Sequence, residues 1–551
     1  MYTDPYLTKQ LIAYIGNKRS LLPFLSEVFD SFDLGNSVVF SDPFSGSGSV
    51  SRLAKYKGYQ VHCNDWEYYS YIANSCYIGI NANEKKDLFK RQGGITQTFK
   101  DFNNLSGSFD PYISKYYAPK NTIKADYLTE RLFYTKENGE FIDRARGYIK
   151  ELYPGSNLTE IEQKEKNILL ASLLFEVSTH ANTSGVFKAC HKGFGGHGKD
   201  ALGRIMAPME MEIPHLVNSE YNNSVSNTDA LEFVKGRTTD ICYLDPPYNI
   251  HQYGSNYFML NTVALWDKPA VNQERGLDGR YKEKAGIRKD WIKTKSPYCY
   301  RDQAQAAFID LMDNIDARYI ILSYNTEGII PFTTLFDIME MHGKVSLHIK
   351  DYVLYRGGKQ SLSRKNYNME LLLVVDRKGK PDGKDRFKVK RFLKENQILT
   401  QLRMAYSPKR LDSTFNMNGS ESCRLTSNSN ELKTFKGYNF LDQPSDLGLL
   451  TEDVLEDVSK KLLKAQCADN FEETMTLISL LEKANNGNDI KKIQKRILIV
   501  YKKLAFKKYI ELFNKVTGIL NQKIKNEDKN FLNLTKGVKE IEGIAELRFK
   551  G

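Results

Sequence analysis

The sequence lacks the patterns that mark exported, membrane-spanning and disulfide-stabilised proteins. No apolar run is long enough to cross a bilayer, and the first twenty residues hold no basic segment followed by an apolar one, so we expect no export. The cysteines are scattered without any Cys-x-x-Cys pair: Cys63, Cys76, Cys190, Cys242, Cys299, Cys423 and Cys467. The absence of these patterns favours a cytoplasmic protein with reduced thiols, and predicts no membrane association and no metal site.

Acidic residues are outnumbered. The chain has 79 Lys and Arg against 67 Asp and Glu, a net charge of +12. Such an excess favours a polyanionic partner, most simply nucleic acid, although lysine-rich surfaces also occur without one. The length of 551 residues is too great for one ordinary core and predicts two or three domains.

Short apolar runs alternate with helical patterns in two parts of the chain. Residues 37–64 are typical of a strand, a Gly/Ser loop, a helix and a second strand, and buried-type runs return at 241–244 and 371–375. This alternation predicts an α/β protein with a doubly wound sheet, built from residues 1–66 and 226–376.

The other regions have different compositions. Residues 67–225 are rich in helix formers and predict a long, mainly helical insertion, while 377–395 are basic and turn-rich and predict a linker. Residues 396–551 predict a separate, mainly helical domain, in which the apolar spacing of 489–525 predicts an amphipathic helix. Within it, 491–525 hold eleven Lys and Arg against one acid, which suits a DNA-recognition or partner-binding module but also a merely solvated face.

The stretch "SDPFSGSGSV", residues 41–50, predicts a strand, a turn and the start of a helix. Gly46 and Gly48 would let a ligand approach the backbone and the free N–H groups of the helix, or would only form a tight turn. The third glycine of the dinucleotide-binding fingerprint and the lysine of a Walker loop are both missing.

Acidic residues near strand ends suit an adenosyl ligand. Asp65 follows the second strand and can accept hydrogen bonds from both ribose hydroxyls, while Trp66 can cover an adenine ring. Asp229 precedes a later strand and can accept a hydrogen bond from an adenine amino group. Both aspartates could equally be helix N-caps.

The sequence "ICYLDPPY", residues 241–248, ends a predicted strand on Asp245. Two prolines stiffen this exit and leave the Pro246 carbonyl as a second acceptor beside the carboxylate, while Tyr248 offers a stacking surface. Two acceptors on one exocyclic amine direct its lone pair at an electrophile and stabilise the developing positive charge. A base of a duplex would have to flip out to enter. The alternative is a stiff turn.

The segments "AYIGNK", "DPFSGSGSV" and "DPPY", in this order, resemble the D12 class of DNA N6-adenine methyltransferases, alpha group, which includes the Dam methylases and many restriction-system modification enzymes. The resemblance spans residues 10–376. It implies a Rossmann-like class I S-adenosylmethionine-dependent methyltransferase sheet, transfer to N6 of a flipped adenine in duplex DNA, and location in a prokaryotic cytoplasm at the nucleoid. The aspartate of the tetrad, rather than serine, favours adenine.

The resemblance also implies the roles of individual residues. The methyl donor would be bound by Tyr14, Lys18, Asp42, Phe44, Gly46, Gly48, Asp65, Trp66 and Asp229, and the target adenine by Asp245, Pro246, Pro247 and Tyr248. Basic residues in two glycine-containing or aromatic-containing stretches suit phosphate contacts, unless they are solvated loops: Lys188, Lys192, Lys199, Arg204, Arg280, Lys282, Arg288, Lys289 and Lys293.

Other functions stay open at this stage. The chain could pair with a cognate restriction endonuclease, or carry a nuclease of its own in the C-terminal region. It could also be a non-catalytic specificity subunit that retains the fold, although the complete tetrad disfavours this, or act on RNA.

Overall fold

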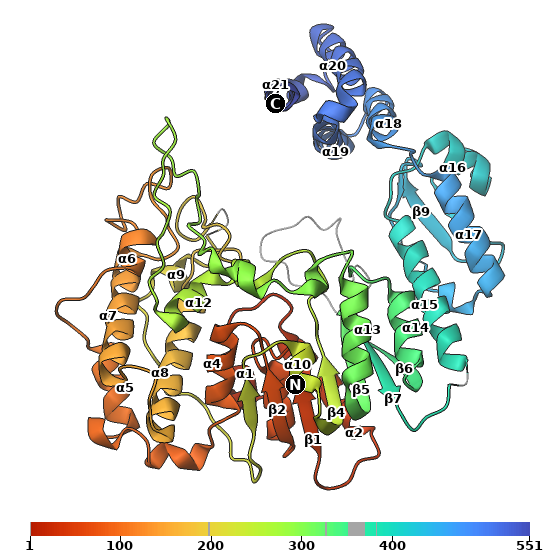
Figure 1. The fold of residues 1–551 in the computed structure, drawn as a ribbon. Helices are drawn as coiled ribbons and strands as arrows, with labels where there is room; N and C mark the ends of the chain where they lie inside the picture. The colour runs from red at the N-terminus through yellow and green to blue at the C-terminus, as the bar shows by residue number, and fades with distance from the viewer. Residues whose placement is uncertain are drawn as a thin grey trace. The chain divides into compact units, whose positions relative to one another are not determined.

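The computed structural model describes residues 2–196, 199–325, 328–350, 370–381, 383–442 and 444–550. The chain divides into two compact units, Met1–Asp385 and Arg386–Gly551 (Figure 1). None of the helices in these described ranges is long and apolar enough to cross a membrane.

A seven-stranded sheet forms the centre of the first unit, with the strand order β3-β2-β1-β4-β5-β7-β6. The strands from β3 to β5 are parallel, whereas β7 runs antiparallel to both of its neighbours. The predicted α/β class is therefore confirmed, with a mainly parallel sheet. The bounds are β1 (Val39–Asp42), β2 (Gln60–Asn64), β3 (Ser224–Ser226), β4 (Thr238–Leu244), β5 (Asp316–Asn325), β6 (Lys344–Lys350) and β7 (Glu370–Asp376).

Strand β1 is paired on both sides, and this brings three chain segments together. Asp42 lies opposite Cys63 of β2, and Ser41 lies opposite Cys242 of β4. Because parallel strands end at the same edge, the segments that follow β1, β2 and β4 meet there, which is the usual ligand-binding edge of an α/β sheet.

Most of the helices of the first unit outside the insertion lie between the strands along the chain. Their bounds are α1 (Pro5–Thr8), α2 (Leu22–Asp30), α3 (Ser49–Tyr56), α4 (Tyr68–Tyr77), α10 (Ala230–Val234), α11 (Tyr253–Asn256), α12 (Phe258–Leu265), α13 (Ala304–Asn314) and α14 (Phe332–Glu340).

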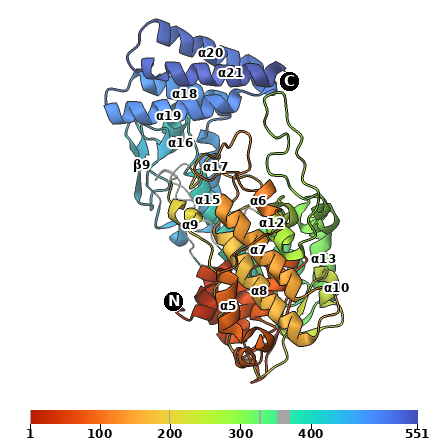
Figure 2. The same cartoon turned by 90° about the vertical axis from the view of Figure 1, so that its left-hand side faces the viewer.

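The insertion shares the core of the sheet. Its long helices α7 (Lys136–Leu152) and α8 (Glu160–Thr179) run side by side (Figure 2), and α8 also contacts α4 and α12. Leu173 of α8 belongs to the same buried cluster as Phe40 of β1 and Ile321 of β5. The insertion is therefore packed into the first unit rather than appended to it. Its shorter helices are α5 (Ile95–Asn103), α6 (Ile113–Tyr116) and α9 (Leu202–Met206).

A buried arginine fixes the N-terminal segment. Arg52 of α3 is 1% exposed, and its guanidinium lies 3.4 Å from the centre of the Tyr77 ring. It donates hydrogen bonds to the backbone carbonyls of Tyr6, Lys9 and Gln10 at 3.0–3.2 Å. These contacts therefore hold in place the backbone that precedes Tyr14 and Lys18.

The second unit contains helices and a small antiparallel sheet that composition did not predict, with the strand order β10-β9-β8. The strands are β8 (Ser422–Arg424), β9 (Glu431–Phe435) and β10 (Asn439–Phe440). The helices are α15 (Lys384–Gln401), α16 (Pro408–Phe415), α17 (Glu452–Ala465), α18 (Asn470–Glu482), α19 (Gly487–Leu504), α20 (Ile510–Lys525) and α21 (Thr535–Lys550).

Two sequence predictions need correction in this region. Most of the expected linker at 377–395 belongs to α15, because Val389 and Phe392 are spaced to bury one face of a helix. The basic stretch 491–525 forms two helices rather than one, α19 and α20, which are separated by a 3-10 turn at Lys507–Tyr509.

We expect Arg52→Met to lower the free energy of unfolding of the first unit by about 2–4 kcal/mol, because it removes hydrogen bonds from a charged donor and leaves buried carbonyls unpaired. Urea unfolding followed by tryptophan fluorescence would measure this. All three tryptophans, Trp66, Trp266 and Trp291, belong to the first unit. The exposed control Lys86→Met should change stability by less than about 0.5 kcal/mol; an equal loss in both variants would contradict the anchoring role.

Candidate active site

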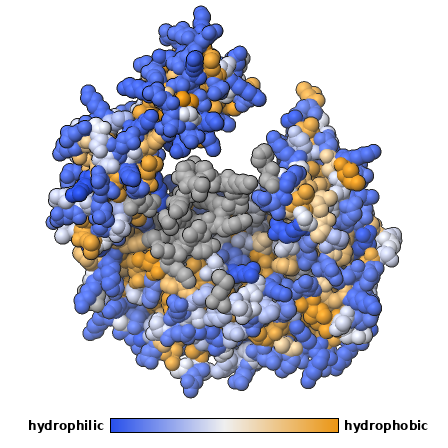
Figure 3. Space-filling model, turned by 180° about the vertical axis from the view of Figure 1, so that it is seen from behind, coloured by the Kyte–Doolittle hydropathy of each residue, from blue (hydrophilic) through white to orange (hydrophobic). Residues whose placement is uncertain are grey.

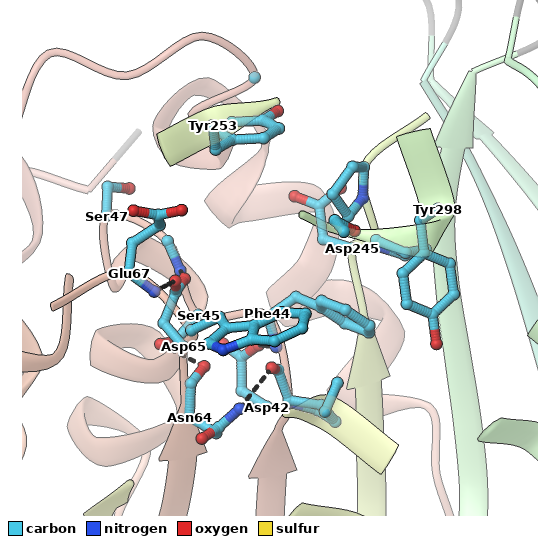
Figure 4. A pocket seen from close by; sticks show the side chains of 18 of the residues that line it. Asp42, Phe44, Ser45, Ser47, Asn64, Asp65, Glu67, Asp245, Tyr253 and Tyr298 are labelled. Carbon is cyan, nitrogen blue, oxygen red and sulfur yellow. Dashed lines mark hydrogen bonds between the residues drawn. The ribbon is translucent and has the colours of Figure 1, made fainter. Parts of the chain in front are cut away.

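A cavity of about 980 Å³, partly open to solvent, lies where β1, β2 and β4 end. Figure 4 shows Asp245 across this cavity from Ser47 and Glu67, with Asp65 and Phe44 below and Tyr253 above. The cavity brings together twelve of the thirteen residues that the sequence analysis assigned to donor and target binding: Tyr14, Lys18, Asp42, Phe44, Gly46, Asp65, Trp66, Asp229, Asp245, Pro246, Pro247 and Tyr248.

The thirteenth residue, Gly48, does not line the cavity and is the N-cap of helix α3. Both loop glycines have positive φ, +50° for Gly46 and +77° for Gly48. A Cβ at Gly48 would stand 2.3 Å from Oδ1 of Asn74, whose amide nitrogen is held by Ser45 Oγ at 3.1 Å. Gly48 therefore permits close packing beneath the loop, whereas Gly46 faces the cavity.

Asp65 connects the two loops that follow β1 and β2. Its Oδ2 accepts a hydrogen bond from the Gly46 amide at 2.7 Å, and its Oδ1 accepts one from the Glu67 amide at 2.8 Å. Burial raises the pKa of Asp65, and these backbone hydrogen bonds lower it. Each carboxylate oxygen has a second lone pair, so Asp65 can still accept hydrogen bonds from a ligand.

Two other aspartates line the cavity and also form hydrogen bonds that stabilise the surrounding fold. Asp229 Oδ1 accepts a hydrogen bond from the Leu231 amide at 2.8 Å, so Asp229 is the N-cap of α10. Asp42 is 1% exposed and accepts from Ser51 Oγ at 2.7 Å. Burial, with a smaller contribution from nearby Asp245, raises the pKa of Asp42 to about 8, although the hydrogen bond from Ser51 lowers it.

Lys18 offsets the acidic character of the cavity. Its Nζ lies 3.2 Å from Oδ1 of Asp245, with the lysine side chain 4% exposed and the aspartate 20% exposed. Among the described residues that line the cavity, Lys18 is the one lysine or arginine. The ammonium therefore places a positive charge directly beside the carboxyl group of Asp245.

Aromatic rings that the sequence analysis did not assign surround the predicted residues. Tyr14 stacks on Tyr257 with ring centroids 4.8 Å apart and on Tyr253 at 5.3 Å. Tyr298 contacts the Phe44 ring edge-to-face at 5.3 Å. The spacing of four residues between Tyr253 and Tyr257, immediately after the tetrad, was the signal that could have identified them.

Glu67 is a further cavity residue that the sequence analysis missed. Its Oε2 accepts a hydrogen bond from Asn261 Nδ2 at 2.6 Å, and the side chain is 6% exposed. Burial raises the pKa of Glu67 to about 7, and the hydrogen bond from Asn261 lowers it. This carboxyl therefore changes its charge near neutral pH.

The predicted phosphate-contacting residues lie in two segments of the first unit, 188–204 and 280–293; Arg204 belongs to α9 and Lys293 to a 3-10 helix. Those exposed to solvent are Lys188, Lys192, Lys199, Arg204, Arg280, Lys282, Lys289 and Lys293. Lys282 pairs with Glu274, and Lys199 donates to the Phe194 carbonyl at 2.7 Å. Both lysines nevertheless keep exposed side chains.

Arg288 is a correction to that prediction. Its side chain is 2% exposed and forms ion pairs of 2.6 Å with both Asp267 and Asp290. Counting basic residues ignored these flanking acids, which draw the guanidinium inward. Arg131, which was not predicted, fixes the same loop through hydrogen bonds to the carbonyls of Lys284, Asn272 and Glu283.

Comparison with known proteins gives a consistent result. The family model described as "D12 class N6 adenine-specific DNA methyltransferase" matches residues 14–330. The type II methyltransferase M.NlaIII of Neisseria lactamica is 33% identical over 349 residues, which cover 63% of this chain and 93% of that protein. M.FokI of Planomicrobium okeanokoites is 32% identical over 333 residues, 60% of this chain and 47% of that protein. StsI of Streptococcus sanguinis, a modification methylase, is 31% identical over 374 residues, 66% and 52% respectively.

We expect Glu67→Gln to become more stabilising, relative to the natural protein, as the pH rises from 5 to 8. The folded-state pKa of Glu67, about 7, is raised above its ordinary value. The natural protein therefore loses stability as the pH rises through this range, by up to about 3 kcal/mol, while glutamine cannot ionise and keeps an acceptor for Asn261. Urea unfolding at several pH values would measure the difference.

The exposed Glu27→Gln serves as the control for this measurement, and Asp42 contributes equally to all three proteins. A stability difference between Glu67→Gln and the natural protein that does not change with pH would show that Glu67 does not titrate in this range.

Proposed function

The chain belongs to the D12 class of N6 adenine-specific DNA methyltransferases, since the family model spans more than half of it, and from this premise we propose how its cavity serves the reaction. The enzyme is an adenine-specific DNA methyltransferase with S-adenosylmethionine as methyl donor. We assign the donor and the target adenine to the same cavity. The observation that carries this assignment is the position of Asp245, which lines the cavity together with the glycine loop and Asp65.

The residues present suit the donor. Asp65, bridging the two loops, would accept hydrogen bonds from the ribose hydroxyls, and Asp229 one from the adenine amino group. Trp66 and Phe44 offer aromatic surfaces for the adenine ring. Lys18 and Tyr14 would lie toward the methionine end, and the excess of carboxylates suits a cationic ligand. When bound, S-adenosylmethionine supplies an electrophilic methyl group on a sulfonium.

The tetrad would receive the target adenine after it has left the duplex. The Asp245 carboxylate and the Pro246 carbonyl would each accept a hydrogen bond from the N6 amino group and so orient its lone pair. Lys18 supports this role as a positive charge 3.2 Å from the Asp245 carboxyl group. Tyr248, whose ring contacts Tyr324 edge-to-face at 5.9 Å, would stack on the extruded base.

We further propose that the chain is the modification component of a restriction–modification system, because the relatives are type II and modification methyltransferases. A cognate endonuclease would then be its partner. The first unit would combine a class I methyltransferase sheet with a helical insertion that reads the DNA, and the exposed lysines of residues 188–204 and 280–293 would contact phosphates. Incubation of plasmid with the protein and Mg²⁺ tests for a nuclease in the chain itself.

Asp245→Ala should lower the transfer of labelled methyl groups to duplex DNA by about 10²–10³-fold or more, since it removes an acceptor used in the transition state. Duplex binding should persist. Filter-binding and methyl-transfer assays on the same preparation would measure both, with the exposed Asp33→Ala as the matched control. Transfer at the natural rate by Asp245→Ala would remove position 245 from the catalytic machinery.

Tyr248→Ala should weaken capture of the flipped base by about 1–3 kcal/mol, the usual value of one stacking contact. Long-read sequencing of DNA from cells that express the protein would first identify the target adenine. The fluorescence of 2-aminopurine placed at that position would then measure base capture. Tyr56→Ala, an exposed tyrosine of α3, is the control. An unchanged 2-aminopurine signal with Tyr248→Ala would exclude the stacking role.

A further inference from the structure

Almost all of the basic excess of the chain lies in the second unit. Residues 386–551 contain 31 Lys and Arg against 21 Asp and Glu, a net charge of +10, whereas residues 1–385 contain 48 against 46, a net charge of +2. The family match ends at residue 330, within the first unit. The unit with the strongest charge is therefore the one outside the matched catalytic region.

The charge is concentrated on α19 and the 3-10 turn that follows it. Between residues 490 and 510 there are eight Lys and Arg and no acidic residue. We define the α19 basic face as Lys491, Lys492, Lys495, Lys502 and Lys503, all of which are exposed. The opposite side of α19, with Ile493, Ile497, Val500 and Leu504, is 0–1% exposed and packs in the hydrophobic cluster of α18–α21. Helical periodicity accounts for this separation of the two sides.

These lysines are not neutralised by neighbouring acids. Across the described parts of the chain, no ion pair engages any member of the α19 basic face, whereas on α17 Lys460 pairs with Glu456 and Lys461 with Asp457. The adjacent Arg496 is also engaged, by Glu473 at 2.6 Å. Hydrophilic side chains dominate the visible part of the second unit, at the upper left of Figure 3.

We propose that the α19 basic face binds the phosphate backbone of duplex DNA without regard to sequence. From Lys491 to Lys503 the helix rises about 18 Å, which matches about five phosphates of one strand at 3.4 Å each. Lysines act as flexible point charges and suit contacts that carry no base information. A nearly neutral catalytic unit gains general DNA affinity from such a surface. This inference rests on the proposed function for the identity of the polyanion.

A membrane surface fits this face less well. Helices that bind in a membrane interface insert their apolar side, but here the apolar side of α19 is occupied by the core of the second unit. Of the polyanions that remain, duplex DNA is the one on which the catalytic unit acts.

The test uses the full chain and a 30-base-pair duplex of random sequence, with binding followed by fluorescence anisotropy over a range of salt concentrations. The test variant is Lys495→Gln/Lys502→Gln/Lys503→Gln. The matched control is Lys460→Gln/Lys461→Gln/Lys464→Gln, which makes the same charge change on another helix of the same unit. Log affinity falls linearly with log salt, and each lost phosphate contact makes this slope about 0.9 less steep. We therefore expect the slope of the test variant to be less steep by about 2–3, and its affinity at low salt to be at least about tenfold weaker.

The control variant should keep its slope within about 0.5 of the natural protein. If both triple variants lost the same amount of affinity and slope, net charge alone would explain the effect and the proposal would be overturned. An unchanged slope in the test variant would also overturn it. Displacement of the duplex by phosphatidylglycerol vesicles or by single-stranded RNA at equal phosphate concentration would show that duplex DNA is not the preferred ligand of the α19 basic face, and would overturn that assignment.

Methyl transfer separates this proposal from the proposed function. The test variant should keep the kcat of the natural protein on long DNA while its KM for DNA rises at least about tenfold. If the natural protein transfers no methyl group but the slope still depends on the α19 basic face, the proposed function fails and the DNA surface stands. If transfer is normal and the slope does not change in the test variant, the DNA surface fails alone.

Discussion

Parallel pairing of β1 with β2 on one side and with β4 on the other is the constraint on which the cavity depends. It brings Asp42, Asp65 and Asp245 to one edge of the sheet, although β4 begins far along the chain from β1. Burial of these carboxyl groups is costly and their mutual repulsion adds to the cost, so that the pKa of Asp42 is raised to about 8. The ion pair between Lys18 and Asp245 partly offsets this repulsion. The strand pairing that creates the cavity therefore also creates its concentration of negative charge.

The position of Lys18 depends in turn on contacts outside the cavity. Arg52 holds the carbonyls of the N-terminal segment, and the Tyr257 hydroxyl accepts a hydrogen bond from the Ile15 amide at 2.7 Å. The backbone that leads to Lys18 is thus held at two places. This arrangement is consistent with electrostatic preorganisation, in which charged groups are placed before the reaction begins.

The sequence allowed the α/β class and the family to be predicted because glycine turns and the Asp-Pro-Pro-Tyr tetrad have local geometric meanings. It did not reveal interactions between distant residues. Arg288 looked like a phosphate contact because the sequence did not show that both Asp267, 21 positions away, and Asp290 would pair with it. Glu67 was passed over because its burial depends on α12, and Arg131 because the loop that it holds is more than a hundred residues distant. The first part of α15 was read as a linker because its polar residues mask two widely spaced apolar ones.

The pairing of Phe40 with Ile241 also has a consequence during protein synthesis. About 200 residues separate these partners, so one edge of β1 has no strand beside it until the ribosome has passed β4. At about 5–20 residues per second this delay is roughly 10–40 s. Throughout that time an apolar strand edge is open to wrong pairing, and long-range closure of this kind is slow. Expression at reduced temperature or with a chaperone that shields strand edges should therefore increase the yield of folded enzyme.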